Sequence, residues 1–294
     1  MATRFELVLE GRDAVRMRAL AEEVFEEIQL CEESWSLFLP GSLLAKVNRE
    51  AASRPVDLDP LTFELLREAL EVARLSGGYF DPTLAPLMER FGFRSEDRTS
   101  DAMSWGADAV LLDEEAQTVA FTKSGLALDL GAIAKGRALD LAADILRERG
   151  VQNALLHGGT SSVVALGTPP DEEAWRVALT PEDDAPCALL RDQALSVSAN
   201  RGRTNDSGGH VIDPLRGEPC RVHSTAAVIA DSASLADAWA TALCAAGERE
   251  LELPGDLCAL RRFDSDAVEA RSTSWCALGA PTSSFQSSES PLAL

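Results

Sequence analysis

Two hydrophobic periods alternate along this chain. Residues 3–10 place Phe5, Leu7 and Leu9 between polar residues, which predicts a half-buried strand. Apolar residues at helical spacing predict four main helices, over 13–34, 59–78, 134–149 and 234–247. Because strands and helices follow one another without a strict βαβ order, the pattern predicts an α+β fold with mixed sheets and packed helices.

Further strands are predicted where short apolar runs are bounded by turn residues. Three lie in series, at 109–113, 118–122 and 126–130. Later candidates are the runs NALLHGG, SVVALG, WRVALT, CALLR, ALSVSA, HVIDP and TAAVIA. No repeat or linker interrupts residues 1–278, which we interpret as one domain. The Ser/Pro-rich segment 279–294 is predicted to be a disordered tail.

Charge and cysteine usage exclude several classes of function. The 294 residues carry a formal net charge of −21, which argues against wrapping nucleic acid or an anionic membrane. The six cysteines have no C-x-x-C spacing, so they indicate neither a zinc site nor a disulfide framework. No run approaches the length of a membrane span, and the chain opens on a strand pattern with no apolar leader before it. We therefore expect a cytoplasmic protein with reduced thiols.

The stretch LDLGAIAKGRALD, residues 128–140, joins an apolar run to a helix through glycine. A glycine at such a junction lets a ligand approach the backbone, and a lysine at the helix start adds a positive charge. The same residues are also compatible with a tight turn whose lysine lies in solvent. Taken alone, the segment favours the simple turn.

Asp237 and Thr241 are four residues apart on the 234–247 helix, so they share one face. A carboxylate and a hydroxyl there present the hard oxygen ligands that Mg²⁺ prefers. An equally simple interpretation is a surface aspartate and a threonine bonded to its own helix.

His210 precedes the apolar run VIDP and is one of three histidines in the chain. A histidine near neutral pKa can take a proton from an attacking hydroxyl, although a lone histidine in a strand is more often structural. The run SGGYFDPTLAPL places Tyr79, Phe80 and Asp81 after a glycine pair. Aromatic faces and a carboxylate are suited to binding a planar heterocycle. The aromatic residues are equally compatible with anchors in the hydrophobic core, with the aspartate starting a turn. Phe38 allows the same two interpretations, a ligand contact or a core anchor.

Six segments, read in order, resemble the ApbE family, the FAD:protein FMN transferases. They are spread from residue 1 to about residue 247 and comprise MATRFELVLEG, SLFLPGSLLAKVN, SGGYFDPTLAPL, LDLGAIAKGRALD, GHVIDPLRG and SLADAWATAL. The fourth is nearly identical to the family's Asp-Leu-Gly-Ala-Ile-Ala-Lys-Gly motif. The resemblance implies an ApbE-like α+β fold related to the T-fold.

The resemblance also implies a role for each residue of the site. The carbonyl of Ala132 would bind Mg²⁺ together with Asp237 and Thr241. Lys135 would hold the FAD diphosphate, and His210 would act as the base. The remaining contacts to FAD would come from Met1, Phe38, Tyr79, Phe80, Asp81, Asp129 and Ile212.

The implied reaction moves FMN from FAD to a Thr or Ser hydroxyl of an acceptor redox protein and releases AMP. Two alternatives use the same site: Mg²⁺-dependent hydrolysis of FAD, and FAD binding without catalysis. The segment SVSANRGRTNDSGGH, residues 196–210, departs from the family pattern, as does LLHGGTSS. Arg216 stands where the family usually has Thr, and either adds a cation near phosphate or lies at the surface.

Overall fold

The computed structural model describes residues 3–94, 103–179, 187–200, 204–205, 208–220, 224–255, 257–263, 267–271, 278–279 and 292–293. Met1 lies outside the described residues, as does all of the predicted tail except Gly279 and residues 292–293. The predicted disorder of that tail and the predicted single domain over 1–278 therefore stay predictions.

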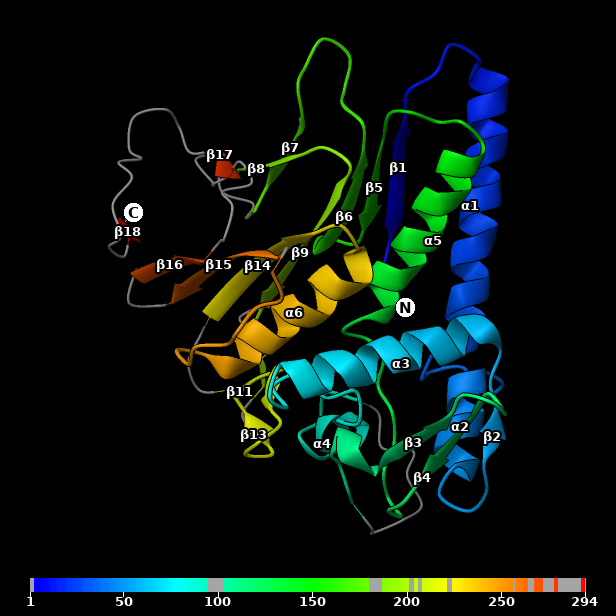
Figure 1. Cartoon of the computed structure of the whole chain (residues 1–294), viewed down its shortest axis with the longest axis vertical. Coiled ribbons are helices and arrows are strands. Elements are labelled where there is room, and N and C mark those ends of the chain that lie inside the picture. Colours follow the sequence, from blue (N-terminus) through cyan, green and yellow to red (C-terminus); the bar gives the residue numbers. More distant parts are fainter. Residues whose placement is uncertain are drawn as a thin grey trace.

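An eight-stranded sheet forms the centre of the molecule (Figure 1). In sheet order its strands are β1 (Phe5–Leu9), β5 (Ala154–Gly158), β6 (Ser162–Leu166), β9 (Gln193–Ala199), β14 (Ser224–Ala230), β15 (Cys258–Phe263), β16 (Ala267–Arg271) and β18 (Leu292–Ala293). Each neighbouring pair is antiparallel. β6 is buried along its whole length, which explains why it reads as a continuous apolar run rather than an alternating one.

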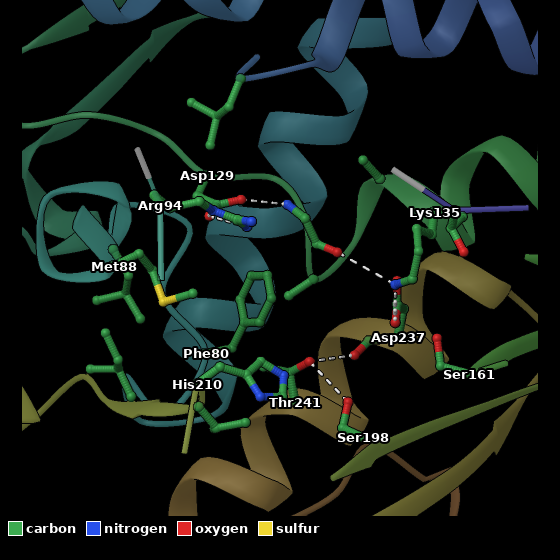
Figure 2. A pocket seen from close by; sticks show the side chains of 18 of the residues that line it. Phe80, Met88, Arg94, Asp129, Lys135, Ser161, Ser198, His210, Asp237 and Thr241 are labelled. Carbon is green, nitrogen blue, oxygen red and sulfur yellow. Dashed lines mark hydrogen bonds and ion pairs between the residues drawn. The ribbon is translucent and has the colours of Figure 1, made fainter. Parts of the chain in front are cut away.

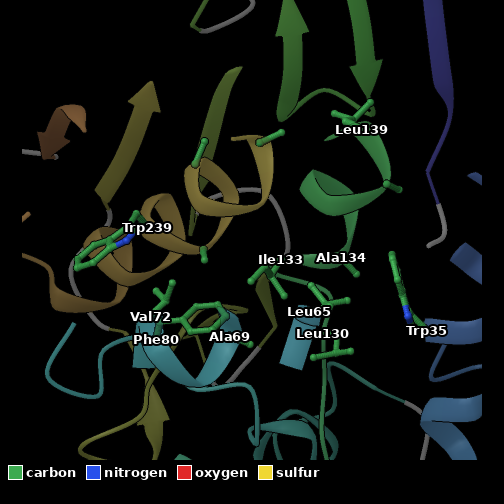
Figure 3. Close-up of a cluster of buried hydrophobic side chains, with 14 of the residues drawn as sticks. Trp35, Leu65, Ala69, Val72, Phe80, Leu130, Ile133, Ala134, Leu139 and Trp239 are labelled. Atoms are coloured by element: carbon green, nitrogen blue, oxygen red, sulfur yellow. The ribbon is translucent and has the colours of Figure 1, made fainter. Parts of the chain in front are cut away.

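Three helices cover one face of this sheet: α1 (Ala14–Trp35), α5 (Ala134–Glu148) and α6 (Ala233–Ala246). The apolar stripe of α1 is buried at spacings of three and four residues, at Leu20, Val24, Ile28, Cys31 and Trp35. α3 (Pro60–Leu75) runs beneath α5 and α6 and joins the same core (Figure 3). Confirmation of these four predicted helices shows that helical periodicity was a sufficient signal here.

The opposite face of the sheet packs against a second, smaller sheet. This sheet contains β7 (Trp175–Ala178), β8 (Cys187–Leu190) and β17 (Leu278–Gly279). Trp175, Val177 and Leu190 meet Leu155, Val163 and Ile229 from the large sheet in a separate apolar cluster. Because both faces of the sheet are covered, neither face of its central strands is exposed to solvent.

A third sheet lies below α3, formed by β2 (Val56–Asp57), β4 (Thr118–Phe121) and β3 (Val110–Asp113) (Figure 1). α2 (Leu43–Glu50), α4 (Ala85–Arg90) and a 3-10 turn at Ala107–Ala109 surround it. Two short ribbons complete the described strands: β10 (Thr204–Asn205) with β11 (Gly208–Gly209), and β12 (Ile212–Asp213) with β13 (Glu218–Pro219).

The strand predicted at 126–130 is wrong. Among the residues that the structure describes, its β pairing is limited to an isolated bridge between Ala127 and Leu84, which itself lies outside any strand. The side-chain amide of Asn48 takes the place of a strand partner: it donates to the Leu128 carbonyl at 3.0 Å and accepts from the Leu128 amide at 2.8 Å. The Asp129 amide donates to the Pro82 carbonyl at 2.7 Å. A distant side chain thus satisfies the backbone groups that would otherwise join a sheet.

The start of α5 crosses the start of α6 at Gly136. A Cβ atom at Gly136 would lie 2.1 Å from the Ala233 carbonyl oxygen, so only glycine permits this approach. One turn further along α5, Asp140 accepts hydrogen bonds from the Ala233 and Ser234 amides at 2.7 and 2.9 Å. Burial raises the pKa of Asp140, and these hydrogen bonds oppose the shift. The side chain of one helix thereby caps the other, and their two beginnings are held together.

None of the described helices is both long enough and apolar enough to cross a membrane. None of the five cysteines within the described residues is joined in a disulfide. Burial raises the pKa of Cys31 and Cys220 to about 12, which makes both thiols unreactive near neutral pH.

Candidate active site

A cavity of about 690 Å³ lies where the end of α1, α4, the start of α5, α6 and β9 approach one another. This volume is in the range of sites for small organic ligands. Every predicted site residue that the structure describes lines the cavity: Phe38, Tyr79, Phe80, Asp81, Asp129, Ala132, Lys135, His210, Ile212, Asp237 and Thr241. Figure 2 shows that the labelled side chains among them, such as Phe80, Lys135 and Asp237, come from elements far apart in the chain. The fold therefore brings the separate sequence signals into one place.

An ion pair between Lys135 and Asp237 lies at the centre of the site (Figure 2). The lysine ammonium is 2.7 Å from Oδ2 and 3.0 Å from Oδ1 of the carboxylate. The side chain of Asp237 is 3% exposed and that of Lys135 is 19% exposed, so the pair is largely shielded from solvent. Lys135 also donates to the Gly131 carbonyl at 3.4 Å. The close crossing of α5 and α6 at Gly136 positions both Lys135 and Asp237.

Serine hydroxyls from β6 and β9 surround the carboxylate of Asp237. Ser196 donates to Oδ1 at 3.1 Å and Ser162 does so at 3.5 Å, and both serines are fully buried. Thr241 donates to the Asp237 carbonyl at 3.1 Å and shares a 3.2 Å hydrogen bond with Ser198. The sequence motifs assign no role to these serines. Ser196 and Ser198 are two residues apart in a strand and therefore point to the same face of the sheet. This spacing is the sequence pattern that indicates a shared polar surface.

Arg94 forms the other ion pair of the cavity wall. Its guanidinium lies 2.7 Å from Asp129 Oδ2, and its carbon atom lies 5.4 Å from the centre of the Phe38 ring. Asp129 also accepts the Gly131 amide at 2.8 Å. The Phe38 side chain, which is 54% exposed, marks the mouth of the cavity. Arg94 belongs to none of the predicted motifs, and only the tertiary fold identifies it.

The residues after α3 contribute one side of the cavity. Tyr79 and Phe80 are both buried, and the Tyr79 hydroxyl is bonded to Arg249. The Asp81 carboxylate accepts from the amide and the hydroxyl of Thr83 at 2.8 and 2.6 Å. Burial raises the pKa of Asp81, and the Thr83 contacts oppose that shift. The turn interpretation of Asp81 is therefore correct, although the residue also lines the cavity.

His210 and Ile212 reach the cavity from the segment that contains β11 and β12. His210 and Thr241 both line the cavity and are labelled in Figure 2. Ile212 is 3% exposed and adds an apolar surface. Arg216 does not line the cavity: its side chain is 61% exposed and lies 3.6 Å from Asp213. The surface interpretation of Arg216 is therefore confirmed.

The donor set around Asp237 fits Mg²⁺ in its chemistry. A buried carboxylate, the Thr241 hydroxyl and the nearby Ala132 backbone offer hard oxygens only, which suit this ion. The carboxylate already has a cation, the Lys135 ammonium, in contact with it. Among the residues that the structure describes, no group of three or more His, Cys, Asp or Glu could hold a metal ion. Mg²⁺ commonly retains several waters and needs few protein carboxylates.

The fold and the cavity define an α+β protein whose candidate site lies between α5, α6 and β9 on one side and the segments that follow α1 and α3 on the other. The chain matches the model of the ApbE family over residues 1–255 and belongs to that family. The structure is similar to that of the ApbE protein of Thermotoga maritima, with a TM-score of 0.80 and 28% identity, covering 92% of this chain and 94% of that one. The α+β, ApbE-like fold is thereby confirmed.

Relatives from several bacteria carry the name FAD:protein FMN transferase. The protein of Rhodobacter capsulatus is 34% identical over 233 residues, which are 74% of this chain and 44% of that protein. The chain thus spans less than half the length of that relative. The protein of Klebsiella pneumoniae is 28% identical over 269 residues, which are 85% of this chain and 81% of that protein.

Proposed function

We propose that this protein is a Mg²⁺-dependent FAD:protein FMN transferase that moves FMN from FAD to a Thr or Ser hydroxyl of an acceptor redox protein and releases AMP. The single observation that carries the proposal is the buried Lys135–Asp237 pair in a cavity that the other described motif residues also line. The names of the relatives support the same activity. Cytoplasmic location stays a prediction from the sequence.

FAD binding needs apolar surface for the rings and positive charge for the diphosphate. Phe38, Tyr79, Phe80 and Ile212 supply apolar surface, and Asp129 lies close enough to the cavity to contact the nucleotide. Lys135 lies in the first turn of α5, where the helix dipole adds partial positive charge. Both contributions favour a diphosphate at this end of the cavity.

In the transfer step, the acceptor hydroxyl oxygen forms a bond to the FMN phosphorus while the bond from that phosphorus to the AMP oxygen breaks. AMP leaves with the bonding electron pair, and His210 takes the hydroxyl proton. Lys135 stabilises the charge that develops on the phosphate oxygens. Asp237, Thr241 and the Ala132 carbonyl would hold Mg²⁺, which when bound would neutralise charge on the diphosphate.

FAD titration by calorimetry tests the site, in Mg²⁺ and in EDTA, with wild type and Asp237→Ala. We expect binding that weakens on chelation and in the variant. Asp57→Ala is the matched control, because Asp57 is an exposed aspartate on β2 outside the cavity. This variant should bind FAD as the wild type does. Absence of FAD binding by the wild type would overturn the proposal.

Product analysis then separates the reactions. We expect AMP release that requires an acceptor redox protein with an exposed Thr, together with covalent flavin fluorescence on that acceptor. AMP release at the same rate without acceptor would indicate FAD hydrolysis instead. FAD binding without AMP release under either condition would indicate a non-catalytic FAD-binding protein.

A further inference from the structure

Lys135 and the proposed Mg²⁺ need the same carboxylate. The ammonium contacts both oxygens of Asp237, at 2.7 and 3.0 Å, and Asp237 is the carboxylate of the proposed ligand set. A lysine ammonium and a divalent cation repel each other strongly at such short range in a shielded site. Lys135 therefore cannot keep this contact while Asp237 binds a metal ion in the same place.

The surroundings of the pair allow the lysine to leave while the carboxylate stays in place. Ser196 on β9 and Ser162 on β6 donate hydrogen bonds to Oδ1 of Asp237, and these bonds do not involve Lys135. The carbonyl of Gly131, 3.4 Å from the ammonium, gives the lysine a second acceptor within reach. A long lysine side chain can exchange acceptors by changes in its rotamer.

We propose that Lys135 is a resident counter-ion of the metal site, which neutralises Asp237 until a divalent cation displaces it and frees its ammonium for the FAD diphosphate. This inference rests on the proposed function and adds an order to it. The metal ion and the lysine exchange places on Asp237, so metal binding prepares the second cation that the diphosphate needs. No covalent bond changes in this exchange.

The proposal predicts opposite effects of one substitution on two ligands. Lys135→Met removes the cation that competes for Asp237. Mn²⁺, used as a spectroscopic probe in the absence of FAD, should therefore bind roughly tenfold more tightly, a change equal in free energy to a shift of one pKa unit. FAD measured with saturating Mn²⁺ should bind more weakly, because the diphosphate loses a cation. Electron paramagnetic resonance of free Mn²⁺ gives the first affinity, and calorimetry gives the second.

Two further variants make the comparison specific. Lys123→Met is the matched control, because Lys123 is a partly exposed lysine paired with Asp108 outside the cavity, and both affinities should stay at wild-type values. Lys135→Gln keeps a hydrogen-bond donor for Asp237 but lacks the charge, so it should also bind Mn²⁺ more tightly. It provides the test if Lys135→Met does not fold. Thermal unfolding should show a larger stabilisation by Mn²⁺ in both Lys135 variants than in wild type.

We expect the wild type to bind Mn²⁺ in this test and the Lys135 variants to bind it more tightly. If their Mn²⁺ affinity is equal to or lower than that of the wild type, the counter-ion role of Lys135 is overturned and the transferase proposal stays intact. Absence of Mn²⁺ binding by wild type would overturn the metal site itself, and the inference would fall with it. Tighter Mn²⁺ binding together with weaker FAD binding supports both.

Discussion

At the residue scale, Asp129 shows how one carboxylate holds two parts of the cavity wall. It accepts the amide of Gly131 and the guanidinium of Arg94, and its side chain is only 9% exposed. The segment 126–130 has Asn48 as a partner rather than a strand. The geometry of this wall therefore depends on a few side-chain contacts, which makes each of them measurable.

Arg94→Ala should destabilise the protein by about 2 kcal/mol, because it leaves a shielded carboxylate without its charge partner. Urea unfolding measures the change. The matched control is Arg67→Ala. The Arg67 side chain is 57% exposed and that of its ion-pair partner Glu64 is 46% exposed, so the loss of stability should be far smaller. Equal losses in the two variants would show that shielding of the Arg94 pair adds nothing.

Residues differ in how far the sequence predicted them. Asp237, Thr241 and Lys135 belong to motifs whose local spacing in the sequence indicates them as site residues. Arg94 does not, because an arginine after FGF has no local pattern that points to Asp129, 35 residues later. The contact exists only because the segment after α4 and the segment before α5 meet in space.

At the scale of elements, the crossing of α5 and α6 sets the geometry of the site. Gly136 lies against the backbone of Ala233, and its neighbour Lys135 reaches Asp237 one turn along α6. Asp140 holds the start of α6 from the same helix. The glycine of the LDLGAIAKG motif that follows the lysine therefore brings helices together, a role that the sequence interpretation did not foresee.

Gly136→Ala should destabilise the protein by more than about 2 kcal/mol, because the clash with a backbone oxygen exceeds the gain of about 1 kcal/mol in helix propensity. FAD affinity should fall as well, since a shift between the two helices would move Lys135 and Asp237 out of reach of the same diphosphate. Gly41→Ala is the control, because a Cβ atom there meets nothing within 4 Å. Denaturant unfolding and FAD titration measure both effects; unchanged stability of Gly136→Ala would contradict the close-crossing argument.

At the scale of the whole molecule, the net charge of −21 acts on folding through self-repulsion. The repulsion is long-ranged, so salt should screen it. For the proposed transfer reaction, this charge would favour an acceptor with a basic surface.

Raising NaCl from about 20 to about 300 mM should raise Tm by a few degrees, since the screening length falls well below the size of the molecule. Choline chloride at the same ionic strength should have the same effect, because screening depends on ionic strength rather than on the cation. Differential scanning calorimetry measures both. A Tm that falls with salt would show that attractive surface ion pairs outweigh the repulsion.

The sequence by itself determined the helices, most of the long strands, the α+β class and the set of motif residues, because hydrophobic period and local spacing are written along the chain. Tertiary structure alone decided that these motifs line one cavity, that Asn48 replaces a strand partner at 126–130, and that Arg94 and the serines of β6 and β9 join the site. Those contacts link residues up to about a hundred positions apart, such as Lys135 and Asp237. Such pairing follows from packing of the whole core, which no short window of sequence contains.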